Sequence, residues 1–258
     1  MQLVRANHSN ELEDGLRGEQ ELARELNVEA LGPVMVVAPH PDDETLGCGG
    51  LIARCASLGK PVTVLAMTTG DASHPGDAAW RARLARIRGR EQLAALCALG
   101  VNPPDLVSMS LPDGSLDSMG MEVETEILAE ITSVIRARGI CSVFLPATDD
   151  CHSDHRATAR LVCRGLKENP VDRVFSYQIW PPDRRALHVV ANEQPYHLDM
   201  RDLVGVKRRA IQEHRSQLGV VDEAHTEGFR MPEELLREKL KDREVYGRVK
   251  DLVAWSQC

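Results

Sequence analysis

The sequence contains few aromatic residues, no excess of basic residues and no long apolar run. Phe, Trp and Tyr together make up 3% of the 258 residues, so aromatic platforms that stack the bases of a nucleic acid are not expected. The net charge is −8 and the pI is about 5.6, which argues against a surface that binds nucleic-acid phosphates or an anionic membrane. The composition favours a small-molecule substrate, with neither nucleic acid nor membrane as a partner.

Signals for membrane insertion and secretion are also missing from the sequence. No stretch approaches the ~20 apolar residues that span a bilayer. The first residues lack the basic-then-apolar order of a signal peptide, since Glu11, Glu13 and Asp14 follow Arg5 and His8. The 7 cysteines form an odd set without a Cys-x-x-Cys pair, which suits a reducing compartment better than a disulfide framework. We therefore expect a cytoplasmic protein, as a monomer or a homo-oligomer.

From residue 33 onward, short apolar runs alternate with amphipathic segments. Strands are expected over residues 34–38, 61–68, 105–109 and 141–145, and helices over about 45–58, 78–99, 121–138 and 155–168. Such alternation indicates right-handed βαβ units. The predicted fold class is therefore α/β, with a mostly parallel sheet flanked by helices.

The two ends of the chain depart from this alternation. Residues 9–30 are charged and helix-prone, which predicts a helical extension over 1–30. Beyond about residue 170, strand-forming segments at 171–180 and 187–198 precede a basic helix at about 201–218, which together suggest a smaller C-terminal addition to the main domain at 31–218. Residues 219–258 are polar and are predicted to form a helical tail packed on the same domain, with one helix opening at Pro232-Glu233-Glu234.

The most informative motif lies directly after the first apolar run. Residues 38–44 read Ala-Pro-His-Pro-Asp-Asp-Glu. Acidic groups crowded at the end of a buried strand repel one another unless a cation neutralises them. Because ligands of parallel sheets bind outside the carboxyl ends of the strands, we interpret this turn as half of a metal site.

A second motif follows the predicted strand at 141–145. It reads Asp-Cys-His-Ser-Asp-His over residues 150–155. Either His152 or His155 could join His40 and an aspartate from the first motif in a site with two histidines and one carboxylate. Catalytic zinc uses such sets and keeps a position open for water. We predict Zn²⁺, although nitrogen and oxygen ligands also accept Fe²⁺, Mn²⁺ or Co²⁺.

The residues of the two motifs are expected to divide the chemistry between them. Asp42 and Asp43 are adjacent, so their side chains diverge; one should bind the metal and the other should act as general base. Of His152 and His155, one should bind the metal and the other should face the developing oxyanion. Asp154 is expected to orient a neighbouring imidazole. Spacing alone leaves both choices open.

Simpler interpretations explain less of the pattern. Asp-Asp-Glu after a proline could cap the next helix, but capping needs one carboxylate and no histidine. A dinucleotide-binding oxidoreductase would need a third glycine where Ile52 stands. A magnesium-dependent phosphatase would leave the histidines unexplained. A non-catalytic metal-binding or carbohydrate-binding module would not require spare acid and base groups.

The two motifs resemble the signature of the PIG-L/LmbE family of zinc-dependent N-deacetylases, (A/P)HPDD(E) followed by HxDH. Further similarity lies in Gly47-Cys48-Gly49-Gly50, Arg88-x-x-Glu91, Leu111-Pro112-Asp113-Gly114, Lys207 and His214-Arg215-Ser216-Gln217. The resemblance spans residues 34–217. It implies a Rossmann-like deacetylase domain.

The resemblance also makes the choices that spacing left open. It implies zinc ligands His40, Asp43 and His155, general base Asp42, and His152 at the tetrahedral intermediate with Asp154 as its partner. The implied reaction removes an N-acetyl or other N-acyl group from an amino sugar or its conjugate. Either Asp42 or His152 would protonate the leaving amine.

Contacts to the sugar are expected from polar residues outside the metal set, because sugar recognition depends on directional hydrogen bonds. The candidates are Arg88, Asp113 and His214. Arg88 could instead pair with Glu91 on a helix surface, and His214 could be a buried packing residue. Trp180 could stack on a sugar ring or pack on the domain.

Overall fold

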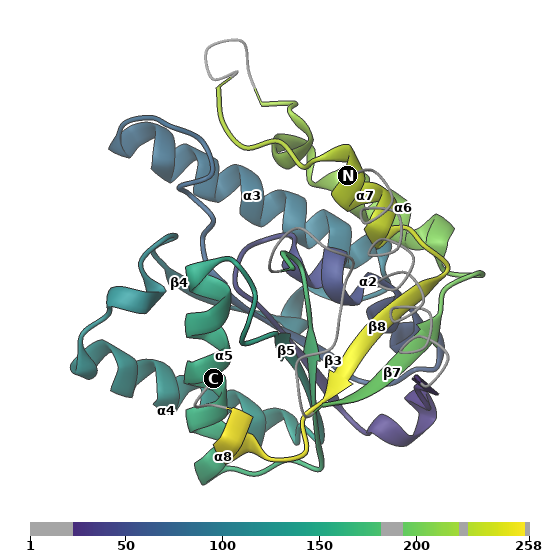
Figure 1. Cartoon of the computed structure of the whole chain (residues 1–258). Coiled ribbons are helices and arrows are strands. Elements are labelled where there is room, and N and C mark those ends of the chain that lie inside the picture. Colours follow the sequence, from purple (N-terminus) through teal and green to yellow (C-terminus); the bar gives the residue numbers. More distant parts are fainter. Residues whose placement is uncertain (1–22, 182–192, 222–226, 256–258) are drawn as a thin grey trace, which may run out of the picture.

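The computed structural model describes residues 23–181, 193–221 and 227–255. Within them, eight strands form one sheet in the order β1-β7-β8-β6-β5-β2-β3-β4 (Figure 1). The strands are β1 (Arg24–Glu25), β2 (Val34–Ala38), β3 (Val62–Thr68), β4 (Leu106–Leu111), β5 (Ser142–Pro146), β6 (Arg173–Tyr177), β7 (Gln194–Asp199) and β8 (Arg243–Arg248). β8 runs antiparallel to both its neighbours, and the other paired strands are parallel. The mostly parallel α/β fold is as predicted.

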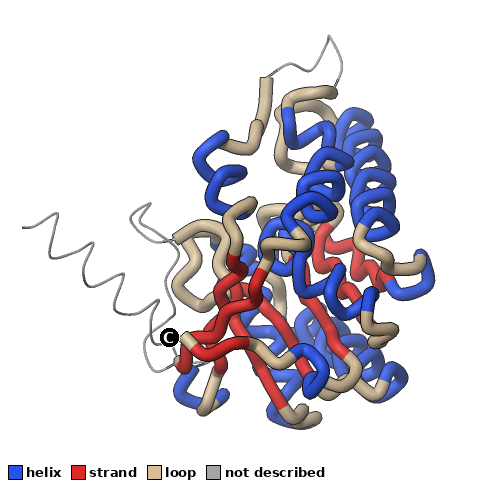
Figure 2. Tube along the Cα trace, turned by 90° about the vertical axis from the view of Figure 1, so that its right-hand side faces the viewer, coloured by secondary structure: helices blue, strands red, loops and turns tan. Residues whose placement is uncertain are grey.

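Helices cover both faces of the sheet (Figures 1 and 2). The α-helices are α2 (Asp43–Ser57), α3 (Ala78–Ala98), α4 (Met121–Arg138), α5 (Ser153–Glu168), α6 (Val204–Glu213), α7 (Glu233–Lys239) and α8 (Leu252–Trp255). One apolar core joins the sheet to α2, α3, α6 and α7, and a second joins the opposite face to α4, α5 and α8. Alternate residues of β2 enter the two cores. Among the described residues, no helix is both long and apolar enough to cross a bilayer.

The strand order places a crevice at the two sequence motifs. From β2 the chain builds outward through β3 to β4, then returns to the other side of β2 and builds outward through β5 to β6. The strand order therefore reverses between β2 and β5. In open α/β sheets, ligands bind at the carboxyl ends of the strands where the order reverses. The first motif follows β2 at this point, and the second follows β5.

The N-terminal prediction fails where the structure can test it. Residues 1–22 of the predicted helical extension lie outside the described residues. Residues 23–30, predicted as its helical end, instead contain the short strand β1 and most of the 3₁₀-helix η1 (Val28–Leu31). The backbone N–H and C=O groups of β1 form hydrogen bonds with β7, which lies about 170 residues further along the chain. Helix propensity reflects local sequence only and does not take such a distant partner into account.

The predicted helical tail over 219–258 is wrong for residues 243–248. They form β8, which lies between β6 and β7 in the sheet. Glu244 and Tyr246 of this strand are buried. A buried carboxylate breaks the apolar alternation by which a strand is recognised, and the segment therefore resembled a polar surface element. The helix after Pro232 begins as predicted. The predicted extension at 1–30, the main domain at 31–218 and the tail at 219–258 all contribute strands to the same sheet.

A buried ion pair joins this tail to the helix that follows the first motif. Helix α2 is interrupted at Cys48, whose φ and ψ are −133° and 15°. Lys207 donates to the carbonyl oxygen of Leu46 at 2.8 Å and to Glu244 at 2.7 Å. Glu244 accepts the backbone N–H groups of residues 50–51 at 2.7 and 2.9 Å. The pair therefore satisfies backbone groups on both sides of the interruption, the acceptor before it and the donors after it.

Candidate active site

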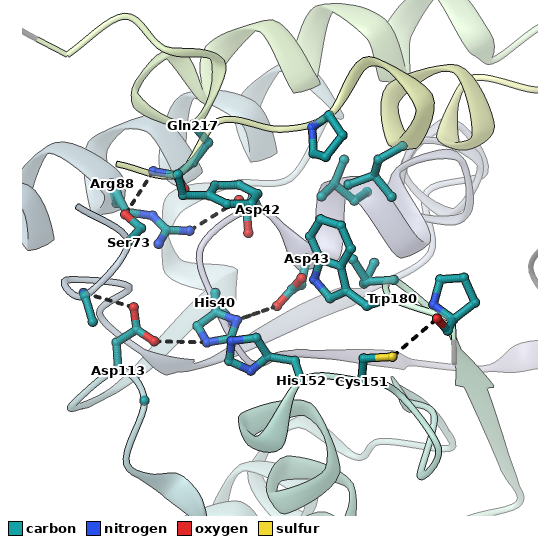
Figure 3. A pocket seen from close by; sticks show the side chains of 18 of the residues that line it. His40, Asp42, Asp43, Ser73, Arg88, Asp113, Cys151, His152, Trp180 and Gln217 are labelled. Atoms are coloured by element: carbon teal, nitrogen blue, oxygen red, sulfur yellow. Dashed lines mark hydrogen bonds and ion pairs between the residues drawn. The ribbon is translucent and has the colours of Figure 1, made fainter. Parts of the chain in front are cut away.

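The first motif leaves β2 and enters α2 within a few residues. His40 lies on the turn, and Asp42 and Asp43 begin the helix. The second motif occupies the turn after β5 and the first turn of α5, which starts at Ser153. The charged side chains of the two motifs meet at the base of a pocket (Figure 3).

Three ligand atoms meet in a compact triangle. Nδ1 of His40 lies 3.1 Å from Oδ2 of Asp43, Nε2 of His155 lies 3.1 Å from the same oxygen, and the two nitrogens are 3.3 Å apart. All three residues are buried. A tetrahedral zinc ion with bonds of about 2.0–2.1 Å places its ligand atoms about 3.3–3.4 Å apart. The three residues therefore fit a zinc ion, with a fourth position left for water or substrate.

The outer nitrogens of the two histidines face carboxylates. Nε2 of His40 lies 3.1 Å from Asp113 and 3.3 Å from Asp154. Nδ1 of His155 lies 3.2 Å from Asp150. Metal-binding histidines commonly donate the N–H of their second nitrogen to such a partner, which fixes the ring and makes the inner nitrogen more basic. The carboxylates thus leave Nδ1 of His40 and Nε2 of His155 to face each other.

Without a cation, this arrangement would place two protonated rings together. Burial lowers the pKa of His155, but the charges of Asp43 and Asp150 outweigh burial and raise it to about 9. Burial also lowers the pKa of His40, and its carboxylate partners raise it well above its usual value. Two imidazolium rings whose nitrogens are 3.3 Å apart repel each other. A metal ion in place of the two inner protons relieves this repulsion.

Two further groupings around His40 contain potential ligand atoms within 4.8 Å of one another. They are His40 with His152 and His155, and His40 with Asp113 and Asp154. In the second grouping, the carboxylates face the outer nitrogen of His40 and are better explained as its hydrogen-bond acceptors. The triangle with Asp43 is the arrangement that pairs each buried imidazole with an outer carboxylate and combines two nitrogens with one oxygen.

Asp42 lies beside the triangle and faces a different partner. Its Oδ2 is 3.3 Å from Nη2 of Arg88. Burial raises the pKa of Asp42 to about 7, against the opposing charge of Arg88. Its φ of 154° is one that L-residues rarely adopt, and such strain is concentrated at functional sites. A carboxylate that titrates near neutral pH at the edge of a metal position is suited to act as a general base.

His152 presents one ring nitrogen to the pocket. Its Nδ1 accepts the backbone N–H of Asp154 at 3.2 Å, so the neutral ring carries its proton on Nε2. The carboxylate of Asp154 turns away and accepts N–H groups from Gly114 and Leu116 at 2.7 and 3.1 Å. Asp154 therefore contacts His152 through its backbone, while its carboxylate orients His40 rather than His152.

Two of the three predicted sugar contacts line the pocket. Arg88 and Asp113 line it, although both already contact side chains of the site, Arg88 at Asp42 and Asp113 at His40. Arg88 donates to the carbonyl oxygen of Gly70 at 2.7 Å as well as facing Asp42, and it does not pair with Glu91. Burial raises the pKa of Asp113, but the hydrogen bond with His40 outweighs burial and lowers it to about 2.

His214 does not line the pocket, contrary to its prediction as a sugar contact. The side chain is buried, and Nε2 lies 3.0 Å from the hydroxyl of Thr45. Burial lowers the pKa of His214 to about 3, so it remains neutral. Its place next to matching motif residues could not reveal that the ring points into the interior behind α2. The position of His214 agrees with the alternative interpretation, in which it is a buried packing residue.

The pocket has a volume of about 1090 Å³ and two contrasting sides. Ser73, Gln217 and Asp113 lie on one side, and Trp180 lies on the other, with His40, Asp43 and His152 between them (Figure 3). The apolar residues of the lining are Ile179, Trp180, Pro181, Phe229, Pro232 and Leu235, and α7 also brings the acidic residues Glu234 and Glu238 to the pocket. The rings of Trp180 and Phe229 meet edge to face, with centroids 6.0 Å apart.

Sequence reasoning missed several of these residues. Gln217 belongs to a matching motif, yet no role was assigned to it. Asp150 stands at the start of the second motif, and its position two residues before His152 could have indicated it. No sequence signal could have placed Phe229 or Leu235 in the pocket, because tertiary packing alone brings the segment before and within α7 over the site.

Comparisons with known proteins show a family match and several relatives. The family model for PIG-L, described as GlcNAc-PI de-N-acetylase, matches residues 35–165. A Bacillus subtilis protein named "Probable N-acetyl-alpha-D-glucosaminyl L-malate deacetylase 2" is 32% identical over 217 residues, which cover 82% of this chain and 90% of that protein. A diacetylchitobiose deacetylase from Thermococcus kodakarensis is 28% identical over 194 residues, which cover 71% of this chain and 69% of that protein.

A solved structure resembles the whole fold. The N,N'-diacetylchitobiose deacetylase from Pyrococcus horikoshii superposes with a TM-score of 0.63, covers 93% of this chain and 91% of its own chain, and is 21% identical in sequence. At this identity the likeness concerns the fold.

Proposed function

The chain belongs to the PIG-L family, and we propose that it hydrolyses the N-acetyl group of an amino-sugar conjugate with the help of a zinc ion. The observation that carries the proposal is the triangle of His40, Asp43 and His155, whose ligand atoms are 3.1–3.3 Å apart. A zinc ion held there would lower the pKa of a water molecule and polarise the amide carbonyl. We place the enzyme in the cytoplasm because of its odd number of cysteines.

Two side chains would move or hold protons. Asp42, with a pKa of about 7, takes a proton from the attacking water. Arg88 holds the carboxylate of Asp42 at the edge of the pocket through the 3.3 Å contact. His152, with its proton on Nε2, donates to the oxygen on which negative charge develops. The amine can receive its proton from Asp42, which carries one after the attack, or from His152.

The pocket supports a conjugate rather than a free monosaccharide as substrate. Pockets that bury a drug-sized ligand have volumes of about 300–1000 Å³, and this one reaches about 1090 Å³. Ser73 and Gln217 can bind sugar hydroxyl groups on the polar side. The apolar lining residues, Trp180 among them, can cover a second moiety. The relatives are named for a malate conjugate and for a disaccharide, and both are larger than N-acetylglucosamine.

The test is acetate release from a panel of acetylated amino sugars. Zinc-loaded protein would be incubated with N-acetylglucosamine, its L-malate conjugate and diacetylchitobiose. We expect at least one conjugate to be cleaved tenfold or more faster than the monosaccharide, an estimate from the contact area available. His155→Ala protein is the matched control and should release no acetate. Failure to cleave any of the three, together with phosphate release from a phosphate monoester, would favour the phosphatase alternative.

A further inference from the structure

Asp150 carries a fully buried carboxylate that has no role in the proposed mechanism. It lies on the turn between β5 and α5. One oxygen, Oδ1, accepts the backbone N–H of His152 at 3.0 Å. The other, Oδ2, accepts the backbone N–H groups of Ile179 and Trp180 at 3.1 and 2.9 Å, and Nδ1 of His155 lies 3.2 Å away.

These contacts connect two parts of the site that come from different strand ends. His155 begins α5 after β5, whereas Ile179 and Trp180 follow β6. β5 and β6 are parallel neighbours, so the turns after them lie side by side. A further bond from the backbone N–H of Cys151 to the carbonyl oxygen of Trp180, at 3.0 Å, joins the same turns. Asp150 is the charged group shared between them.

The sharing has a chemical consequence once a cation binds the inner nitrogen of His155. The outer nitrogen then carries the ring proton, and that N–H becomes more acidic, which strengthens its attraction to Oδ2 of Asp150 at 3.2 Å. Oδ2 of Asp150 also accepts the backbone N–H groups of Ile179 and Trp180. A carboxylate that is held firmly in place therefore fixes the backbone that carries Trp180 into the pocket. An unpaired carboxylate in this buried position would be costly.

We propose that Asp150 is a positioning residue that couples metal binding at His155 to the placement of Trp180 in the substrate pocket. The inference rests on the proposed metal ligands. It predicts that metal affinity and the order of the segment at 179–180 depend on the same carboxylate.

The first test compares zinc affinity in the full-length protein, measured by competition with a chelating indicator. Asp150→Asn should weaken zinc binding by about 10–100-fold, as loss of a carboxylate partner of a metal-bound histidine does. The matched control is Asp149→Asn, because Asp149 is a carboxylate on the same turn, and its Oδ1 accepts a hydrogen bond from Nε2 of Gln178 at 3.2 Å. The zinc affinity of Asp149→Asn should stay within about threefold of the wild-type value, because this variant keeps the carboxylate next to His155. Equal affinities for the two variants would overturn the coupling.

The second test uses the unaltered protein and is independent of how the variants fold. Amide hydrogen exchange is measured by mass spectrometry with and without zinc. The amides of residues 179 and 180 should exchange more slowly when zinc is bound, because their acceptor is then held more firmly. Unchanged exchange at these amides, with zinc bound, would overturn the coupling but not the proposed function. A wild-type protein that binds no zinc would overturn both.

Discussion

Adjacent aspartates of this chain occupy opposite electrostatic environments. Burial opposes ionisation of both, but the charge of His155 outweighs burial at Asp43 and holds its pKa well below the usual value. At Asp42 burial prevails, and the pKa rises to about 7. Paired carboxylates whose pKa values are driven apart commonly take different roles in catalysis. The charged carboxylate suits a metal ligand, and the one that titrates near neutrality suits a base.

The role of Asp42 predicts a loss of rate without a loss of metal. Asp42→Asn should retain zinc and lower kcat by about 10²–10⁴-fold, because an amide cannot accept a proton from water. Zinc content and kcat are measured on the same preparation. Asp117→Asn, at an exposed residue of the 3₁₀-helix η3 (Leu116–Ser118), is the matched control and should behave as wild type. Activity of the Asp42 variant within tenfold of wild type would contradict the assignment.

The contact between Arg88 and Asp42 predicts a shift in pH dependence. The charge of Arg88 lowers the pKa of Asp42, and activity requires the ionised carboxylate. In Arg88→Gln the acidic limb of kcat/KM should therefore move to higher pH, by about 1 unit or more. Arg90→Gln, at an exposed position on the same helix α3, should leave the limb in place. An unchanged limb in the Arg88 variant would show that Asp42 does not control it.

Single residues could be predicted from the sequence where chemistry restricts their use. The two motifs were placed in one site because few other roles explain histidines and carboxylates at two strand ends. The family resemblance then selected His40, Asp43 and His155, and the structure brings their ligand atoms together. Spacing could not separate Asp42 from Asp43, because burial and the neighbouring charge decide between them. His214 was misplaced for the same reason: its environment is set by packing against Thr45.

At the scale of elements, helix α2 consists of two parts held by one buried ion pair. The first part carries Asp43, and the second begins after the interruption at Cys48. Lys207 binds the carbonyl oxygen of Leu46 in the first part, and Glu244 binds the N–H groups at 50–51 in the second. A cation near the end of one helix and an anion at the start of the next are both favourable.

This pairing predicts unequal effects of two substitutions on stability. Lys207→Met should lower the free energy of unfolding by about 3–5 kcal/mol, because Glu244 then remains buried and unpaired. Lys207→Met with Glu244→Gln should recover part of that loss, since glutamine is neutral and can still accept an N–H. Urea denaturation measures both. Arg54→Met breaks an exposed pair with Asp202 and should cost about 1 kcal/mol or less. Additive losses in the double variant would contradict the pairing.

Elements with regular periodicity could be predicted, and those defined by distant partners could not. The helices at 121–138 and 153–168 and the buried strands of the central sheet have the apolar spacing from which they were predicted. β8 was missed because Glu244 is a buried charge within it. β1 was missed because its pairing with β7 depends on the complete fold.

For the whole molecule, topology explains why the site lies where it does. The two motifs are about 110 residues apart in the sequence, yet both follow strands that are neighbours at the reversal of strand order. The alternation of strands and helices predicted a parallel sheet, and the sheet brought the motifs to the same edge. The shape of the pocket could not be predicted, because the last part of the chain completes its lining with both apolar and acidic side chains, namely Phe229, Pro232, Glu234, Leu235 and Glu238.

The central claim is that His40, Asp43 and His155 hold a zinc ion that the hydrolysis requires. The most direct measurement titrates zinc into chelator-treated protein and follows acetate release from the best conjugate of the panel. We predict no release from the metal-free protein and full activity at about one zinc per chain, with neither zinc binding nor activity in His155→Ala. Full activity in the metal-free protein, or in His155→Ala, would contradict the account.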